Sequence, residues 1–261
     1  MRRANLLALG AALLIGSSVT AALGAPADNI VFFLGDGMGP ATVTAARIYR
    51  YGEAGRLKME SLPRTARIRT HSLDAQTTDS APSMSAYMTG VKMRNDVISM
   101  SPETIADQAR CNAQNGAPVA TLLELAKAAG KRTGVVSTAR ITHATPAATY
   151  AHICQRDLEN DIAAQAVPGT GNPALGDGVD LLLGGGRRHF LPKAQAGSKR
   201  TDDRDIIAEL QKTGYSYVAD AAGLDLRKGE IRIGAEFAFY EITGRNGFGC
   251  LGLKHWWWCR W

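Results

Sequence analysis

The sequence predicts an α/β fold with a mostly parallel central sheet covered by helices on both faces. Segments with helical spacing of apolar residues alternate with short, strongly apolar or β-branched runs, and this alternation is typical of such a sheet. Polar turns follow several of the apolar runs, and 261 residues suffice for one domain with a sizeable core. In such sheets ligands gather at the carboxyl ends of strands, so we expect the chemistry directly after them.

The first expected element is a strand over residues 29–34. Its apolar run from Ile30 to Leu34 has no polar interruption, as in a strand buried on both faces. The glycine-rich residues 35–39 then predict a turn, and Pro40 suits the first position of a following helix.

The later elements alternate in the same way. Gly90 and Gly130 each suit the end of a helix, because glycine readily adopts the left-handed conformation found there. We expect helices over residues 81–88, 119–129, 157–167 and 203–213, strands over 133–138, 179–183 and 215–218, and a turn at 184–186.

The start of the chain has the layout of a secretory signal peptide. Arg2 and Arg3 precede an apolar run over residues 6–15 and then small residues, and the run is too short to span a bilayer. A core helix is the alternative. We expect residues 1–25 to be a signal peptide and the mature protein to be periplasmic or secreted.

The end of the chain differs in composition from the rest. All four tryptophans lie within residues 256–261, and the strand–helix alternation fades after about Leu226. An unusual terminus and a shifted reading frame both explain this change, and the composition favours the second. The expected organisation is an α/β domain over residues 26–226 and an atypical tail over 227–261.

The charge is less basic than it first looks. The formal net charge is +6, of which Arg2 and Arg3 contribute +2 and residues 227–261 contribute +3. The body therefore carries about +1, which does not indicate binding to nucleic acid or to an acidic membrane.

The cysteines fit an exported protein. There are four, at Cys111, Cys154, Cys250 and Cys259, and an even number in an exported chain permits disulfides. A Cys111–Cys154 pair is favoured because both lie in the regular body of the chain. No CxxC spacing occurs, so a structural zinc site is not indicated.

Asp36 is the first candidate for chemistry. It follows the first expected strand within GDGMG (35–39), where glycines let the backbone turn and leave room for an ion or phosphate. A carboxylate there is a reasonable ligand for zinc or magnesium. A turn residue that hydrogen-bonds its own backbone is the equal alternative.

Ser80 is the second candidate, within TTDSAPS (77–83). The predicted helix places it at an amino end, where backbone N–H groups and the helix dipole favour an anion such as phosphate. A serine hydroxyl is a weak nucleophile without a base or metal, and no histidine is near it in sequence. Alternatively, Asp79 or Ser80 merely caps the helix.

The third candidate segment contains THATPAA (142–148) and again follows a strand. His143 could bind a metal directly or through water, Thr145 offers a hydroxyl, and Arg156 could clamp a phosphate in bidentate fashion. Local capping or a surface charge is the alternative for each. His152, on an expected helix, is better interpreted as a core histidine.

Together these segments resemble the active-site segments of alkaline phosphatases. GDGMG, TTDSAPS and THATPAA occur in the order found in that family, and LGGGRR (183–188) resembles it too. The similarity covers about residues 28–226, the amino-terminal part of the family's length. It implies an alkaline phosphatase-like fold, incomplete in this chain.

The resemblance implies specific roles, which are as follows. Ser80 matches the nucleophile that forms a phosphoserine, Arg156 the arginine that binds phosphate oxygens, Asp79 a residue that orients it, Asp36 a carboxylate bridging one zinc and the magnesium, Thr145 a magnesium ligand, and His143 a position where members carry Asp or His. The implied activity is hydrolysis of phosphate monoesters by in-line displacement, with two zinc ions and one magnesium ion.

Most of the family's metal ligands come from its second half, and this sequence contains neither an Asp-x-x-x-His segment nor an Asp-His pair. We therefore expect the chain by itself to be inactive. A non-catalytic phosphate- or metal-binding fragment is one alternative. A relative in the phosphodiesterase and sulfatase superfamily is another, although Ser80 with Arg156 argues against it. Expected partners are small phosphomonoesters and, in a full-length parent, a second copy; no nucleic acid and, after signal cleavage, no membrane are expected.

Overall fold

The computed structural model describes residues 29–111, 114–219 and 236–239. The predicted signal peptide, Cys250 and Cys259 lie outside these ranges. In chain order the elements are α1 (Pro40–Tyr51), η1 (Lys58–Ser61), α2 (Ser80–Thr89), η2 (Gln108–Arg110), α3 (Leu122–Ala128), β1 (Gly134–Arg140), α4 (Ala144–Ala147), α5 (Glu159–Gln165), η3 (Pro173–Leu175), β2 (Leu181–Gly185), η4 (Arg187–His189), α6 (Ile206–Lys212) and β3 (Glu236–Phe239).

The described strands form a parallel sheet in the order β1-β2-β3. Val135 lies opposite Leu182, which in turn lies opposite Phe237. Between β1 and β2 the chain passes through α4 and α5, as a parallel connection requires. The α/β class and the incomplete parallel sheet are confirmed.

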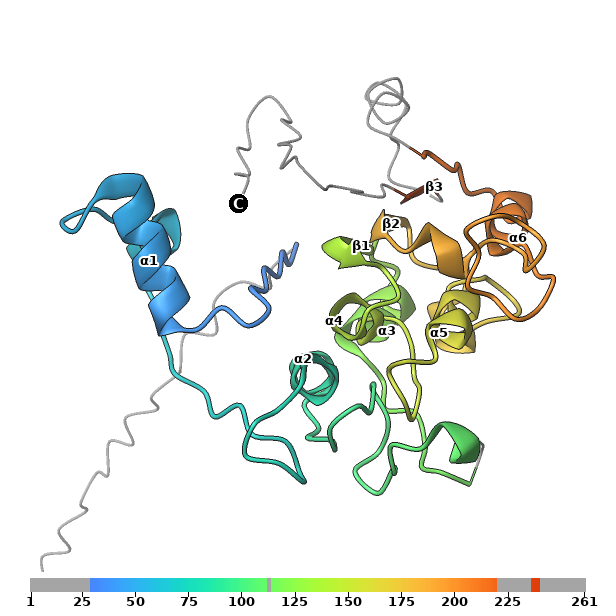
Figure 1. The fold of residues 1–261 in the computed structure, drawn as a ribbon, viewed down its shortest axis with the longest axis horizontal. Coiled ribbons are helices and arrows are strands. Elements are labelled where there is room, and N and C mark those ends of the chain that lie inside the picture. The colour runs from blue at the N-terminus through green and yellow to red at the C-terminus, as the bar shows by residue number, and fades with distance from the viewer. Residues whose placement is uncertain (1–28, 112–113, 220–235, 240–261) are drawn as a thin grey trace, which may run out of the picture.

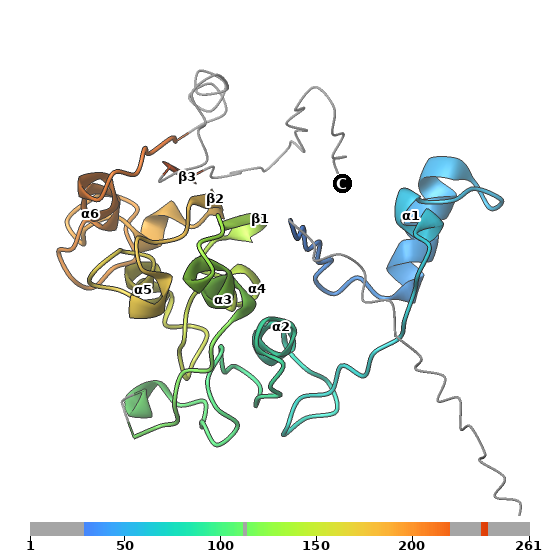
Figure 2. The ribbon, with the colours of Figure 1, turned by 180° about the vertical axis from the view of Figure 1, so that it is seen from behind.

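The helices α3, α4 and α5 all lie on one side of β1 and β2 (Figures 1 and 2). Side chains alternate between the two faces of a strand, and the burial follows that alternation. Val135 is buried, whereas its neighbour Val136 is 65% exposed. The described residues therefore cover one face of the sheet at β1 and leave the other open.

The strand predicted over residues 29–34 is wrong. The segment forms no ladder with any strand that the structure describes, and Ile30, Val31 and Phe33 are at least 60% exposed. An apolar run becomes a strand only by pairing its backbone with a neighbour. Here no described neighbour does so, and composition alone could not reveal that.

The strand predicted over residues 215–218 is also wrong, because packing replaces pairing there. The Tyr215 amide donates to the Leu210 carbonyl oxygen at the end of α6 (3.2 Å), and its buried hydroxyl donates to the Val179 carbonyl oxygen (2.9 Å). The third strand is instead β3, within residues 227–261, where no element was expected.

The predicted helices are present, and local sequence explains where they begin and end. The Asp79 carboxylate accepts the Ala81 amide (2.6 Å) at the start of α2, and Gly90 ends the helix with φ +74°. The helix expected from residue 119 begins later, as α3, because Thr121 and Glu124 form a capping box.

The larger cluster of buried apolar side chains in the described residues extends from α2 through α4 and β2 to α6. Ile162, Leu182, Phe190, Ile206 and Leu210 are all buried within it. His152 is internal as well, with 8% of its side chain exposed, which confirms the core interpretation. None of the helices in the described part of the chain is long and apolar enough to cross a membrane.

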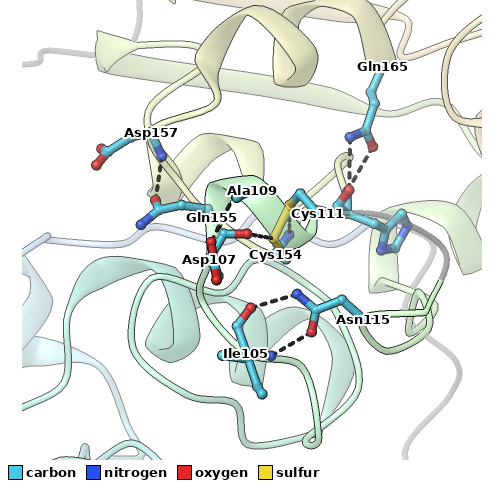
Figure 3. The surroundings of a disulfide bond; sticks show 10 residues. Ile105, Asp107, Ala109, Cys111, Asn115, Cys154, Gln155, Asp157 and Gln165 are labelled. Carbon is cyan, nitrogen blue, oxygen red and sulfur yellow. Dashed lines mark hydrogen bonds between the residues drawn. A yellow bond between two sulfur atoms is a disulfide. The ribbon is translucent and has the colours of Figure 1, made fainter.

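The favoured disulfide is present. Cys111 and Cys154 are bonded across a sequence separation of 43 residues. The Cys154 amide also donates to the Cys111 sulfur at 3.2 Å (Figure 3). Cys154 lies two residues before Arg156, so the bond fixes the approach to a candidate site residue.

Removing this bond with Cys111→Ser and Cys154→Ser should lower the free energy of unfolding by about 4 kcal/mol, because the crosslink limits the unfolded chain. Denaturant unfolding without reductant measures the difference. Reductant should lower the stability of the unmodified chain to the same value and leave the double variant unchanged. Equal stability with and without the bond would contradict this estimate.

Candidate functional site

Three segments far apart in sequence meet at the carboxylate of Asp36. The Ser80 hydroxyl lies 3.0 Å from both carboxylate oxygens, and the Thr145 hydroxyl donates to one of them at 2.7 Å. Asp36 comes from the glycine turn before α1, Ser80 is the first residue of α2, and Thr145 lies in α4. The result is an exposed cluster of carboxylate and hydroxyl oxygens.

Ser80 has the electrostatic setting expected of an anion-binding residue. It stands at the amino end of the ten-residue helix α2, where the helix dipole is positive. Asp79 caps that helix, as the alternative interpretation held. The capping of α2 by Asp79 is therefore compatible with anion binding at Ser80.

The Asp79 carboxylate also fixes a guanidinium group. One of its oxygens accepts the Ala81 amide and an N–H of Arg156 (3.0 Å), and the other accepts the Asp96 amide at 2.6 Å. Arg156 is thereby held beside the amino end of α2. Asp96 was not among the residues indicated by sequence, since nothing local marks a backbone amide as a partner.

His143 lies on the other side of the guanidinium. Its Nε2 is 3.1 Å from Nη2 of Arg156, and because a guanidinium can only donate, Nε2 accepts and Nδ1 carries the proton. Burial, then the positive charges of Arg156 and Arg140, hold the pKa of His143 below its usual value. Nδ1 of this ring is buried and has no hydrogen-bond partner among the residues that the structure describes.

A second, deeper group of side chains supports the loop that carries His143 and Thr145. Glu159 accepts two parallel hydrogen bonds from Arg140, at 2.8 and 2.9 Å, and a third from the Thr142 hydroxyl at 2.6 Å. Burial alone would raise the pKa of Glu159, but the hydrogen bonds from Arg140 and Thr142 hold it below its usual value. Sequence reasoning missed Glu159, because its partners lie 17 and 19 residues away.

The candidate site residues thus form two adjoining groups. The first contains Asp36, Ser80 and Thr145; the second contains Asp79, Arg156 and His143. In the first group, the Asp36 carboxylate accepts the hydroxyls of Ser80 and Thr145. In the second, the Asp79 carboxylate links Arg156 to the start of the helix that begins with Ser80.

The residues present fit only part of the implied metal set. The carboxylate of Asp36 and the hydroxyl of Thr145 are hard oxygen donors that suit magnesium, which keeps several waters and needs few protein ligands. Within the residues that the structure describes, no three His, Cys, Asp or Glu side chains gather in a way that would hold a metal ion. A catalytic zinc needs about three such ligands, so this part of the chain does not fit a zinc pair.

The sequence and the fold are both similar to those of known proteins. A sequence model of the family described as alkaline phosphatase matches residues 27–232. The tissue-nonspecific alkaline phosphatase of Rattus norvegicus is 40% identical over 214 residues, which cover 77% of this chain and 38% of that protein. Streptomycin-6-phosphate phosphatase of Streptomyces griseus is 35% identical over 83% of this chain and 50% of its own length. The chain spans about two fifths of the first curated relatives it matches.

Solved structures agree on the fold. Alkaline phosphatase of Thermus thermophilus is similar with a TM-score of 0.57 and 26% identity, over 77% of this chain and 37% of that one. A variant of the alkaline phosphatase of the Antarctic bacterium TAB5, with Mg bound in its M3 site, has a TM-score of 0.59 and 24% identity, over 78% and 50%.

His189 lies 3.3 Å from Glu159, beneath the loop that carries His143, and should make the stability of the fold depend on pH. Burial, opposed by Glu159 and assisted by the charge of Arg188, lowers the pKa of His189 from 6.5 to about 4. The folded state thus disfavours the protonated ring, and stability present above about pH 6.5 should be lost as the pH falls toward 4, by about 3 kcal/mol. Unfolding measured from pH 8 to pH 4 tests this. A His189→Asn variant should be less stable at neutral pH and show a flatter profile; an equally steep profile would count against the assignment.

Proposed function

Because this chain belongs to the alkaline phosphatase family, we propose that its site serves the metal-dependent hydrolysis of phosphate monoesters through a phosphoserine on Ser80. The observation that carries the proposal is the joint placement of a nucleophile and a phosphate clamp. Ser80 begins α2 within 3.0 Å of Asp36, while Asp79, the cap of the same helix, holds Arg156. Relatives that are 40% and 35% identical to this chain over the matched residues are named as phosphatases.

The chain's own residues have distinct roles in this reaction. The Ser80 oxygen loses its proton and attacks phosphorus, while the bond from phosphorus to the leaving alcohol oxygen breaks and that oxygen takes up a proton. Water then attacks the phosphorus of the phosphoserine, the Ser80 O–P bond breaks, the serine oxygen takes up a proton and inorganic phosphate is released. The serine proton faces the Asp36 carboxylate, which is the acceptor at 3.0 Å. Arg156 uses one N–H toward Asp79 and one toward His143, and its remaining N–H groups stay available for phosphate oxygens.

The metal set is part of the proposal. Two zinc ions and one magnesium ion are implied, and when bound they would lower the pKa of the serine hydroxyl and offset the charge of the phosphate. Asp36 and Thr145 would hold magnesium, with His143 reaching it through water. The TAB5 variant with Mg bound supports a magnesium site in this fold.

The proposal also includes low activity of this chain by itself. Among the described residues no three His, Cys, Asp or Glu side chains gather as zinc ligands, and the sequence lacks the family's Asp-x-x-x-His and Asp-His segments. A serine without metal or strong base is a weak nucleophile. A non-catalytic phosphate- or magnesium-binding role for the chain is the second candidate, and the same incomplete ligand set favours it.

Substrate, compartment and partners follow from the same comparison. The name of the Streptomyces griseus relative indicates a small phosphorylated substrate, and we extend that class to this protein. Ser80 with Arg156 argues against a phosphodiesterase or sulfatase. The charged start and apolar run of the sequence support export to the periplasm or medium, and a homodimer is the proposed assembly of the full-length protein.

The first test is hydrolysis of a chromogenic phosphomonoester at alkaline pH with zinc and magnesium supplied. We expect the 261-residue chain, shown to be folded by circular dichroism, to give little or no turnover above a Ser80→Ala control. Turnover that disappears in the control would contradict the predicted inactivity while supporting Ser80 as nucleophile.

The phosphate clamp can be tested without turnover. Arg156→Lys should weaken binding of inorganic phosphate about tenfold or more, because lysine keeps the charge but loses the planar, bidentate donors. Isothermal titration calorimetry measures the dissociation constant. The matched control is Arg64→Lys at an exposed position, which should bind as the unmodified chain does. No phosphate binding by the unmodified chain would count against the proposed site.

A further inference from the structure

Residues 96–99, here called the strap, are held in an unusual conformation beside the site. Asp96 and Ser99, its two ends, are the described non-glycine residues with positive φ, at +67° and +47°. Such backbone angles are unfavourable for residues with a side chain and persist only where surrounding contacts enforce them. The hydrogen bonds at Asp96 and Ser99 therefore determine the conformation of the strap.

The Asp96 end of the strap touches the phosphate clamp directly. Its amide donates to the Asp79 carboxylate (2.6 Å), and its carbonyl oxygen accepts the Arg156 amide (2.8 Å). Between these ends, Ile98 and Ile153 exchange two backbone hydrogen bonds of 2.9 Å. The position of the strap therefore sets both members of the Asp79–Arg156 pair.

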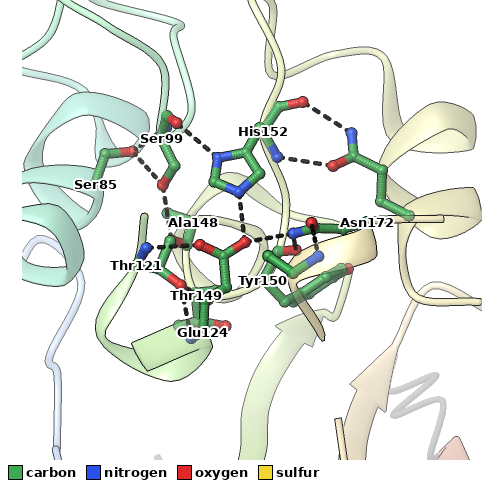
Figure 4. Close-up of polar contacts among 11 residues, drawn as sticks. Ser85, Ser99, Thr121, Glu124, Ala148, Thr149, Tyr150, His152 and Asn172 are labelled. Carbon is green, nitrogen blue, oxygen red and sulfur yellow. Dashed lines mark hydrogen bonds and ion pairs between the residues drawn. The ribbon is translucent and has the colours of Figure 1, made fainter. Parts of the chain in front are cut away.

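The Ser99 end is buried and hydrogen-bonded on every side. Its amide donates to the Ser85 hydroxyl (2.8 Å), and its own hydroxyl donates to the Ala148 carbonyl oxygen (2.9 Å). Its carbonyl oxygen accepts the Val119 amide (2.9 Å) and also faces Nδ1 of His152 at 2.7 Å (Figure 4). A carbonyl oxygen only accepts, so Nδ1 carries a proton and donates it; Nε2 faces a carboxylate, which also only accepts, and therefore donates a proton as well.

The orientation of the His152 ring is set by Glu124. Nε2 of the ring lies 2.6 Å from the Glu124 carboxylate, which also accepts the Thr121 amide (2.7 Å) and the Asn172 side-chain amide (2.5 Å) (Figure 4). Burial alone would raise the pKa of Glu124, but the hydrogen bonds from His152, Thr121 and Asn172 hold it below its usual value. The carboxylate is 4% exposed and fixed by three donors, so the ring has one defined direction.

We propose that His152 is a positioning residue for phosphate binding. Oriented by Glu124, it holds Ser99 in the left-handed conformation, and the strap in turn sets the Asp79 carboxylate and the Arg156 backbone. It acts through the strap and not on phosphate itself. The inference rests on the proposed function of Arg156 as the phosphate clamp, and it assigns to a core histidine an effect that core packing alone would not have.

The two nitrogens of His152 can be tested separately. His152→Asn keeps a donor near the place of Nδ1 and can still reach the Ser99 carbonyl oxygen, but not Glu124. His152→Gln keeps a donor near the place of Nε2 and loses the bond to Ser99. Both shorten or reshape a buried ring, so both should reduce overall stability. The matched control is Ser198→Ala, which removes a part-buried hydrogen bond to the Leu191 carbonyl oxygen, far from the strap in sequence.

The first readout is hydrogen exchange of the Asp96 and Arg156 amides in the full chain, measured by NMR relative to the core amide of Ile162. The expected result is exchange about tenfold faster in His152→Gln, the equivalent of one lost hydrogen bond, and within about twofold of the unmodified chain in His152→Asn and Ser198→Ala. Ser85→Ala, which loosens the strap from α2, should also accelerate the same two amides. It is the substitute variant if His152→Gln does not fold.

The second readout is titration with inorganic phosphate, whose dissociation constant should rise about tenfold in His152→Gln and little in His152→Asn. Equal effects of the Asn and Gln variants, or none from either, would overturn the proposal in favour of a purely structural histidine. Absence of phosphate binding by the unmodified chain would instead contradict the proposed function, and the exchange experiment would still decide the role of His152.

Discussion

The carboxylate of Asp79 satisfies donors from three separate segments, and the arrangement of the site depends on it. It accepts the Ala81 amide at the start of α2, the Asp96 amide from the strap and an N–H of the Arg156 guanidinium. A charged acceptor makes hydrogen bonds of about 1.5–3 kcal/mol, stronger than neutral ones. Helix, strap and guanidinium therefore share one anchor, and Ser80 is the next residue in the chain.

Around the Asp79 carboxylate, oxygen donors and positive charge lie on two different sides of the site. The oxygens of Asp36, Ser80 and Thr145 form one side, suited to a hard cation, while Arg156 and the amino end of α2 form the side suited to an anion. Burial, and then the positive charges of Arg156 and Arg140, hold the pKa of His143 below its usual value. This division of charge is consistent with the proposed phosphate site.

The site rests on buried polar side chains more than on the sheet itself. Glu159 supports the loop of His143 from below, and Glu124 orients His152 behind the strap. Each carboxylate is about nine-tenths buried and satisfied by several donors, as a charge removed from water must be. Their partners come from different elements, so the rigidity of the site is a property of the assembled fold.

The sequence by itself determined the α/β class, the helices with their caps, the disulfide partners and the six candidate site residues. These follow from periodicity, capping and the placement of glycine, serine and aspartate within a few residues of one another. It could not determine whether residues 29–34 and 215–218 form strands, because pairing depends on segments distant in sequence. Only the tertiary structure revealed the roles of Asp96, Glu159 and the Glu124–His152 pair. These side chains interact with partners that lie 17 to 28 residues away in sequence, and no local pattern encodes such contacts.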